Sequence, residues 1–537
     1  MTKSEGGIGL SKEHWDSKSA ELITERDKLS AKVSELELSV SQLSNQNKAL
    51  QLSHAEWLTG WSRDLWLAKP NSYEKRVSLE FIDPIYEHIE LDKETSEIYL
   101  SPLIQRLARV RQLSFSYLHH PMAQHTRLSH SLGVCETMDR AVNHMLHDGI
   151  VYTSSGPLGM KEELSAAKIT PEAFAKTARL LGLLHDIGHG PFGHALDRYM
   201  GYRLKSDIKS VDKDLSVTYV REFLANVIKA HNVDPELIIK VLSYDKEKLT
   251  GFECILGELI DSALDSDRLD FLTRDAYATG LQLGFINPHL IIDAMVPFKN
   301  NIGNVFLAFK KPALDFIEHV LYARSIMYAS CYEQDIKAAA EGMLVLAVKH
   351  FLSEHAKEED IKKIMLLDDE LFLNLMISGP VLQSSNIARL LKLGRVYDKI
   401  YEVHKRFSSK LQAFITEQAR AKRGAGAASQ FVIPDGVWTN DIAALAGLNY
   451  ERDGWRILVV PPSPNVYREL DVNINVLIEN AGAFSTRRAP DLSPTLEATQ
   501  KIIQESRQIV RVFVHPDLKS ETRDNVEKSA RSYFEAS

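Results

Sequence analysis

The chain has 537 residues, of which 44% are hydrophobic and 25% are charged, and its formal net charge is −8 at pH 7. This length and composition are typical of a globular protein with more than one domain, and the acidic balance disfavours nucleic acid or a membrane surface as the main partner. Three widely spaced cysteines, an N-terminus without an apolar core and the lack of a membrane-spanning apolar run predict a cytoplasmic protein.

A heptad repeat marks an N-terminal extension, which we place at residues 1–76. Between about 20 and 52 a leucine recurs every seven residues, and Val33, Val40 and Asn47 occupy core positions between them. This pattern favours a parallel two-stranded coiled coil whose register is fixed by the asparagine. We therefore predict a homo-oligomer, a dimer, tetramer or larger, with a coiled-coil contribution. The alternative is a single amphipathic helix packed on its own domain. The leucines are Leu22, Leu29, Leu36, Leu43 and Leu50.

Helical periodicity dominates the next region, from residue 77 to about residue 420. At its start, FIDPIYEHIEL predicts a short strand pair with Pro84 at the turn. Further on, TPEAFAKTARLLGLLHDIG predicts a helix with Thr170 as its N-cap and Pro171 at its first position. Two glycines and Pro191 should end that helix, and Pro191 is suited to start the next one.

The last region, residues 421–537, is predicted to be a smaller α+β unit. It opens on AKRGAGAASQ, residues 421–430, whose composition predicts a loop. Strand-like runs follow in WRILVV from Trp455, DVNINV from Asp471 and IVRVFV from Ile509, before a final helix through ETRDNVEKSARSYFE. The fold class is thus mostly α, with one large helical domain between the coiled coil and this α+β region.

The stretch LLHDIGHGPFGHALD, residues 183–197, places many ionisable groups beside a leucine-rich helix. Burying an unpaired charge is costly, so these groups must be exposed or bound to something. His185 and Asp186 side by side are suitable ligands for a first-row metal. His130 in HTRLSHSLGV and Asp267 in DSDRLDFLTRD are two further candidates. Taken singly, His130 would more often be a partly buried histidine whose hydrogen bonds are satisfied, and the acids around Asp267 would more often form a solvated helix face.

Together, these motifs resemble the HD-domain phosphohydrolase superfamily and, within it, the deoxynucleoside triphosphate (dNTP) triphosphohydrolase family. The order H…HD…D carries the first resemblance. The segments DPIYEHIEL, QRLARVRQL, HTRLSHSLGV, LLHDIGHGPFGHALD and DSDRLDFLTRD follow the order and spacing of that family, and RSIMYASCY is similar to its pocket helix. The resemblance covers about residues 82–534 and implies an HD-domain helical core.

The resemblance also implies a metal centre and a proton donor. One divalent metal ion would be held by His130, His185, Asp186 and Asp267, lowering the pKa of a bound water and polarising a phosphoryl group. His194 and Asp197 lie three residues apart on one helix face, so Asp197 would orient His194 as the acid that protonates the leaving 5′ oxygen. His189 would contact phosphate or, as the alternative, support the metal site.

Eight further residues match the substrate-binding positions of the family. Arginines would face the triphosphate, and Arg268 stands where the mammalian pattern has Lys. A glutamine, a leucine, an aspartate and a tyrosine would contact the sugar. The alternative for the tyrosine is a structural role in the core. Phe271 stands where the mammalian motif has Tyr. The set consists of Arg127, Arg268 and Arg324 for phosphate and Gln112, Leu113, Phe271, Asp275 and Tyr332 for the nucleoside.

The implied activity is hydrolysis of dGTP or several dNTPs to deoxynucleoside and triphosphate. One alternative is an HD phosphohydrolase acting on another nucleotide phosphoester, and a second is a nucleotide-binding oligomeric scaffold without catalysis. Leu100 and Ala108 stand where the mammalian enzyme has the acidic and basic residues that hold an activating guanine nucleotide. We expect the neighbouring Arg106, Arg109 and Arg111 to form a solvated basic helix face.

Overall fold

A computed structural model describes most of the chain beyond the N-terminal extension. The described residues are 78–203, 211–284, 286–352, 357–424, 437–462, 473–498 and 508–535, together with four residues of the extension, Thr24, Glu25, Lys28 and Lys32. The heptad leucines all lie outside them, so the coiled coil stays a prediction. None of the described helices has the length and apolarity that crossing a bilayer requires.

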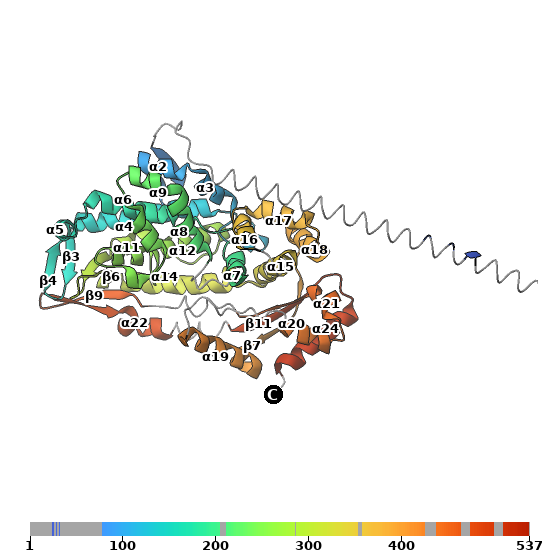
Figure 1. The fold of residues 1–537 in the computed structure, drawn as a ribbon. Helices are drawn as coiled ribbons and strands as arrows, with labels where there is room; N and C mark the ends of the chain where they lie inside the picture. Colours follow the sequence, from blue (N-terminus) through green and yellow to red (C-terminus); the bar gives the residue numbers. More distant parts are fainter. Residues whose placement is uncertain are drawn as a thin grey trace, which may run out of the picture.

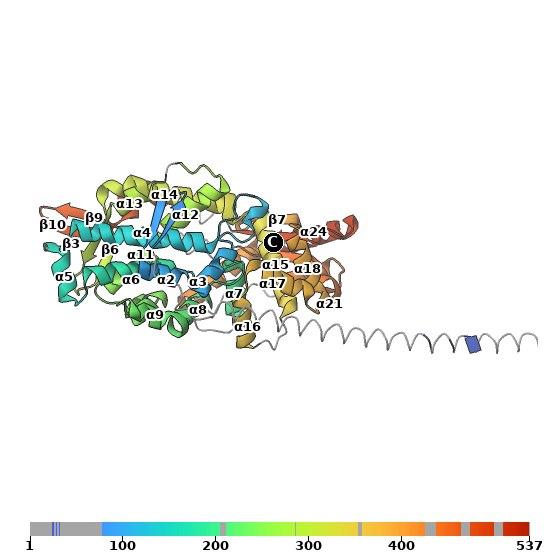
Figure 2. The ribbon, with the colours of Figure 1, turned by 90° about the horizontal axis from the view of Figure 1, so that it is seen from above.

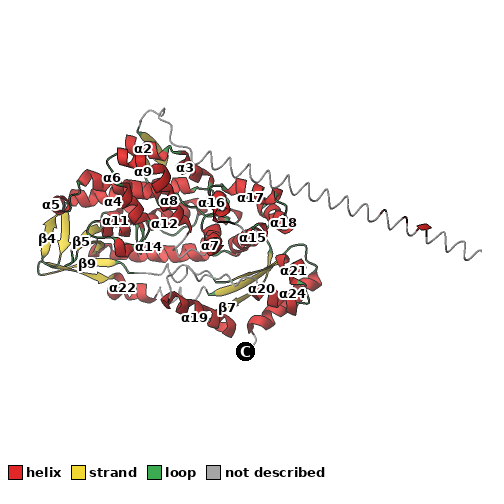
Figure 3. Ribbon diagram, in the orientation of Figure 1, coloured by secondary structure: helices red, strands yellow, loops and turns green. Residues whose placement is uncertain are grey.

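The described part is mostly α-helical, as predicted (Figure 3). Its centre is a group of packed helices that includes α4 (Arg127–Asp148), α6 (Pro171–Leu184), α11 (Glu253–Ile260) and α12 (Ser266–Thr279). The helix α4 packs against both α6 and α12, and the apolar side chains between them, such as Met138 and Leu181, are fully buried. Burial of these faces is the main force that holds the three helices at fixed positions.

The helix α6 begins as predicted. The Thr170 hydroxyl accepts a hydrogen bond from the Ala173 amide at 3.1 Å, and Pro171 is the first helical residue. The helix ends at Leu184, so His185 and Asp186 come directly after its last turn. The next helix, α7 (His194–Arg203), starts at His194 and not at Pro191. Phe192 and Gly193, with φ of 59° and 49°, adopt left-handed conformations that an α-helix excludes.

The predicted strand pair is confirmed, and a larger sheet was not foreseen. Strands β1 (Leu79–Asp83) and β2 (Glu87–Leu91) pair in antiparallel fashion around the turn with Pro84. A six-stranded sheet has the order β10-β9-β6-β5-β3-β4. Its strands are four to six residues long, too short to show a clear period of two within a helical region. They are β3 (Ile150–Thr153), β4 (Gly156–Gly159), β5 (Met295–Lys299), β6 (Val305–Lys310), β9 (Asn475–Asn480) and β10 (Ala483–Arg488).

A three-stranded antiparallel sheet, β7-β11-β8, forms the C-terminal unit with α20 (Val437–Leu445) and α24 (Ser520–Glu535). The strands are β7 (Asp398–His404), β8 (Ile457–Val460) and β11 (Ile509–Val514). This sheet and the six-stranded sheet lie toward opposite ends of the molecule (Figures 1 and 2). Both contain strands from before and after residue 421, because β7 pairs with β11 and β6 pairs with β9. The domain boundary at 421 stays a prediction. The helix α19 (Ser409–Gly424) runs into the first four residues of the predicted loop, which is a correction.

We predict that Gly182→Ala lowers stability through the contact between α4 and α6. A Cβ atom at position 182 would lie 2.7 Å from both the Cys135 Cα and the Val134 carbonyl oxygen, so the helices would have to move apart. Overpacking of this kind costs about 1–3 kcal/mol. Thermal and denaturant unfolding would measure the loss. The control is Gly201→Ala in α7, where a Cβ would come no closer than 4.0 Å to Val211. That variant should unfold at or above the wild-type midpoint, and equal midpoints for both variants would contradict the prediction.

Candidate metal centre and active site

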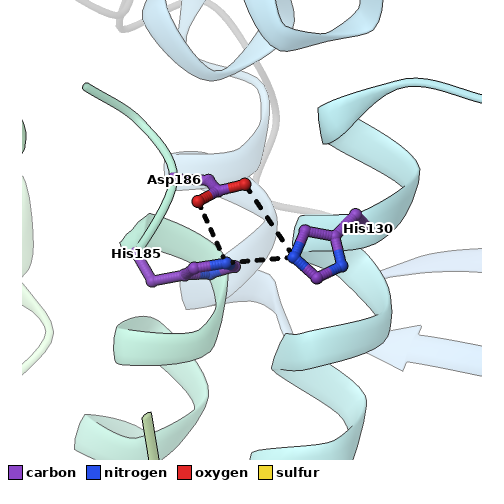
Figure 4. Close-up of side chains that lie close together, drawn as sticks. All are labelled: His130, His185 and Asp186. Atoms are coloured by element: carbon purple, nitrogen blue, oxygen red, sulfur yellow. Dashed lines mark hydrogen bonds and ion pairs between the residues drawn. The ribbon is translucent and has the colours of Figure 1, made fainter. Parts of the chain in front are cut away.

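The four predicted metal ligands converge at the point where α4, α6 and α12 meet. His130 lies in the first turn of α4, His185 and Asp186 follow α6, and Asp267 lies in the first turn of α12. Figure 4 shows the two imidazoles and the Asp186 carboxylate pointing toward one another. His130 Nε2 lies 3.2 Å from His185 Nε2 and 3.0 Å from Asp267 Oδ1. His185 Nε2 lies 3.3 Å from Asp186 Oδ1 and 3.8 Å from Asp267 Oδ1.

Hydrogen bonds to the outer ring nitrogens orient both histidines. His185 Nδ1 donates to the Gly182 carbonyl oxygen at 2.8 Å, and His130 Nδ1 donates to Asp270 Oδ2 at 2.8 Å. Asp270 also accepts two hydrogen bonds from Arg274, at 2.9 Å each. With Nδ1 as the donor, the Nε2 lone pair of each ring faces the centre, as a metal ligand requires. Sequence reasoning missed Asp270 and Arg274, although both lie on the same helix as Asp267.

The centre carries an excess of buried negative charge. Burial lowers the pKa of His130, but hydrogen bonds and charge from Asp267 and Asp270 outweigh burial and raise that pKa to about 10. Burial raises the pKa of Asp270, and the charge of Arg274 with the bonds from His130 and Arg274 lowers it to about 2. The same field that holds a proton on His130 favours a divalent cation in its place. Two imidazoles and two carboxylates within 3.8 Å of a neighbour therefore fit one divalent metal ion.

Asp197 has a different partner from the one expected. Its Oδ2 lies 2.5 Å from His189 Nδ1 but 3.8 Å from His194 Nδ1. His189 is buried, and its Nε2 lies 3.2 Å from Asp186 Oδ1, whereas the His194 side chain is 64% exposed. Asp197 lies in the first turn of α7 and points back into the loop, so it meets the loop histidine and not the one that starts its own helix.

Charge around His189 affects its protonation. Burial and the nearby Arg127 lower its pKa, and three aspartates, Asp197, Asp186 and Asp212, together raise it to about 10. Asp212 lies 3.7 Å from His189 Nε2. Of the phosphate-facing arginines, Arg127 donates from Nη1 to Asp186 Oδ2 at 2.6 Å.

The predicted sugar-facing residues lie close together. Asp275 accepts from the Tyr332 hydroxyl at 2.6 Å and contacts His125 Nε2 at 2.8 Å. The Phe271 and Tyr332 rings meet edge to face at 6.4 Å. Tyr332 is therefore hydrogen-bonded to another of the predicted sugar-facing residues. His125 was missed by sequence reasoning, although it opens the motif HTRLSHSLGV.

The remaining predicted substrate residues are Leu113, Arg324, Arg268 and Gln112. Leu113 and Arg324 of α14 (Leu314–Met327) are buried, and Arg268 pairs with Asp265. Within the described part of the chain, Gln112 Oε1, His125 Nδ1 and Arg127 Nε are buried atoms with no hydrogen-bond partner. Buried polar atoms are nearly always paired, so these three atoms are candidates to bind a polar ligand or an ordered water.

The three arginines of segment 106–111 do not form the solvated face that we expected. Arg106 is fully buried and donates to the carbonyl oxygens of Ile187 at 2.9 Å, His189 at 2.6 Å and Met365 at 3.2 Å. Arg111 pairs with Asp369 at 3.5 Å and Glu370 at 3.7 Å, and only Arg109 is exposed. The prediction was wrong for Arg106 because the segment is a short 3₁₀ turn packed under the loop of the active site.

Comparison with known proteins gives four findings. Residues 127–259 match the family model described as HD domain. The chain is 32% identical over 267 residues to "Uncharacterized protein MG461" of Mycoplasma genitalium, which covers 49% of this chain and 57% of that protein. It is 24% identical over 289 residues to "Deoxynucleoside triphosphate triphosphohydrolase SAMHD1" of Bos taurus, which covers 49% and 46%, respectively. Among solved structures, "Phosphohydrolase (BT4208)" from Bacteroides thetaiotaomicron has a similar fold, with a TM-score of 0.56, 21% identity and coverage of 81% of this chain and 100% of that one.

These findings confirm the fold class and the resemblance. The chain spans about half the length of the curated relatives that it matches. The fitted HD model contains three of the four converging ligands, His130, His185 and Asp186, while Asp267 lies beyond it. Residues 127–259 therefore match an HD domain, and proteins named deoxynucleoside triphosphate triphosphohydrolase are among the relatives of the chain.

We predict that Asp270→Asn weakens metal binding although Asp270 does not face the centre. The amide would remove the negative charge behind His130, and such changes typically lower metal affinity about 10- to 100-fold. Metal titration and elemental analysis of purified protein would measure the effect. The control is Asp139→Asn, which removes a carboxylate paired with Arg179 at 2.9 Å, away from the centre. Equal metal affinity in both variants would contradict the role of Asp270.

Proposed function

We propose that this chain is a metal-dependent hydrolase that converts deoxynucleoside triphosphates to deoxynucleosides and triphosphate. One observation carries the proposal: the converging His and Asp residues contact the buried Arg127, and the His130 ring meets that of Phe271, which in turn meets the Tyr332 ring. The name of the bovine relative supports the substrate class, and the HD match supports phosphoester hydrolysis.

His130, His185, Asp186 and Asp267 would hold one divalent cation, whose identity the donor set does not select. When bound, such a cation lowers the pKa of a water molecule and polarises a phosphoryl oxygen. The chain itself supplies further positive charge. Arg127 Nη1 already contacts Asp186, and its buried Nε has no partner among the described residues, so it is available to a phosphate oxygen. Arg268 and Arg324 would bind the outer phosphates.

His194 and His189 have different surroundings, which suits different roles. The His194 side chain is exposed, which suits a group that donates a proton to the leaving 5′ oxygen of a bound substrate. His189 is held by Asp197 and lies beside Asp186, so it would contact a phosphate oxygen at the centre. Asp197 acts on His194 only at 3.8 Å, and its principal task would be to fix His189.

The nucleoside would be recognised by the Asp275 carboxylate, which already has hydrogen-bond partners, and by Gln112 Oε1, which has none among the described residues. Tyr332 and His125 fix both oxygens of Asp275, each of which keeps capacity to accept a bond from a 3′ hydroxyl. Gln112 Oε1, buried and without a partner among the described residues, is an alternative acceptor for the single proton of that hydroxyl. The Tyr332 ring beneath the sugar would crowd a 2′ hydroxyl, which favours deoxynucleotides over ribonucleotides.

We predict that the protein, given a divalent metal and each dNTP in turn, releases deoxynucleoside and intact triphosphate. Chromatography of the products would show neither dNDP nor orthophosphate as the first product. A chelator and Asp267→Ala should both abolish the reaction, because each empties the centre. His194→Ala should keep the metal and lower kcat by roughly two to four orders of magnitude, the usual worth of a positioned acid.

A matched control separates the acid from general damage. His147→Ala changes an exposed histidine at the far end of α4 and should leave kcat unchanged. Orthophosphate as the first product would refute attack at the α-phosphate. Turnover of nucleoside monophosphates, but not of dNTPs, would favour the alternative HD phosphohydrolase. A fully metallated protein with no turnover of either would favour the non-catalytic scaffold.

We also propose a homo-oligomer joined in part by the N-terminal coiled coil. Five leucines on one stripe would leave an apolar seam exposed on a lone helix, and such seams usually mark an interface. Deletion of residues 1–53 should lower the assembly mass or weaken assembly on dilution, as light scattering would show, with metal content unchanged. Equal mass at every concentration would instead support a helix folded back on its own domain.

A further inference from the structure

The loop of residues 187–193, called the 187–193 loop below, carries His189 and leads into His194. The intrinsic backbone preferences of its residues do not explain its conformation. Phe192 has a φ of 59°, in the left-handed region that a residue with a side chain rarely adopts, and Gly193 follows with a φ of 49°. This turn directs the chain into α7, where Asp197 reaches back to His189 at 2.5 Å. A conformation of this kind persists only where surrounding contacts determine it.

One such contact comes from a residue 177 positions further along the chain. Asp369 Oδ1 accepts a hydrogen bond from the Phe192 amide at 2.7 Å. Asp369 Oδ2 accepts from the Arg111 amide at 3.1 Å, and the Arg111 guanidinium lies 3.5 Å away. Asp369 is the first residue of α17 (Asp369–Ser378) and its accessible surface is 0%. The cap of that helix is its neighbour Asp368, which accepts from the Leu371 amide at 2.8 Å.

The N-cap of α17 is therefore Asp368, and the carboxylate of Asp369 bonds to other segments. A buried carboxylate is costly unless paired, and its partners here are backbone amides of two segments that line the active site. Segment 365–369 contacts the 187–193 loop at a second point. Arg106 bridges the Met365 carbonyl to those of Ile187 and His189, and a Cβ at Gly190 would lie 2.8 Å from the Met365 side chain.

We propose that Asp369 is a positioning residue for the reaction, holding the Phe192 amide and thereby setting where His189 and His194 stand relative to the metal centre. The proposal rests on the proposed function for its catalytic consequence. Asp369 lies outside residues 127–259, which match the HD model, and touches none of the four metal ligands. The ring of Phe192 stacks on Phe115 at 4.4 Å, so the side chain has a separate anchor and only the backbone depends on Asp369.

The test compares Asp369→Ala, Asp369→Asn and Asp368→Ala in the full chain. Hydrogen–deuterium exchange of residues 187–196 reports on the hold of the loop without requiring activity. In Asp369→Ala these amides should exchange roughly 10- to 100-fold faster, the equilibrium worth of a hydrogen bond to a charged group. Metal content should not change, because the four ligands remain. The value of kcat for dNTP hydrolysis should fall by a similar factor, with a smaller change in KM.

The other two variants separate positioning from stability. Asp369→Asn keeps a carbonyl oxygen for the Phe192 amide and should restore most of the protection and of kcat. Asp368→Ala removes an adjacent carboxylate and the cap of the same helix, so it matches the loss of stability while leaving the Phe192 amide bonded. Its exchange at 187–196 and its kcat should equal those of the wild type.

Two results would overturn the proposal. One is unchanged exchange of residues 187–196 in Asp369→Ala. The other is an equal fall in kcat for Asp368→Ala and Asp369→Ala, which would reduce Asp369 to a structural residue of α17. If Asp369→Ala does not fold, Asp369→Asn against Asp368→Ala decides by the same comparison. If the wild type hydrolyses no dNTP, the proposed function fails, and the exchange data still decide whether Asp369 holds the loop.

Discussion

Negative charge buried where three helices meet is the constraint on which the rest of this site depends. Asp186, Asp267 and Asp270 approach the two histidines within a largely apolar interior, where unpaired charge is costly. Arg274 balances Asp270, and Arg127 contacts Asp186, but the inner carboxylates still hold an extra proton on His130. A divalent cation would remove this excess and use the same atoms as ligands. Stability of the helix junction and metal binding are therefore linked.

Close helix packing makes this concentration of charge possible. A Cβ at Gly133 of α4 would lie 1.8 Å from Asp270 Oδ1, so the carboxylate behind His130 has room only because that position lacks a side chain. Gly182 plays the same part between α4 and α6. The terminal strand pair also contributes, since Asp83 of β1 accepts from Arg274 at 2.7 Å. The metal ligands thus depend on a chain of contacts that reaches the edge of the domain.

The conformation of the 187–193 loop depends on residues that are distant in sequence. Its two histidines are close in sequence to the metal ligands, but its backbone is held by Arg106 from one side and by Asp369 from the other. These residues bracket the HD match from outside it. The HD match therefore contains His189 and His194, and segments outside it hold the backbone that carries them.

The sequence by itself determined much of this protein. Thr170 and Pro171 fixed the start of α6, because a cap and a proline act on their immediate neighbours. The motifs also singled out His130, His185, Asp186 and Asp267 as candidate metal ligands, and the fold brings these four side chains together. The tertiary structure decided what depends on long-range contacts. In the folded protein Asp197 is hydrogen-bonded to His189 and Arg106 is buried. Strand β6 pairs with β9, which follows it by more than a hundred residues. Local propensity extends over a few residues, whereas the partner of a buried charge or of a strand edge is whichever segment the packing brings near it.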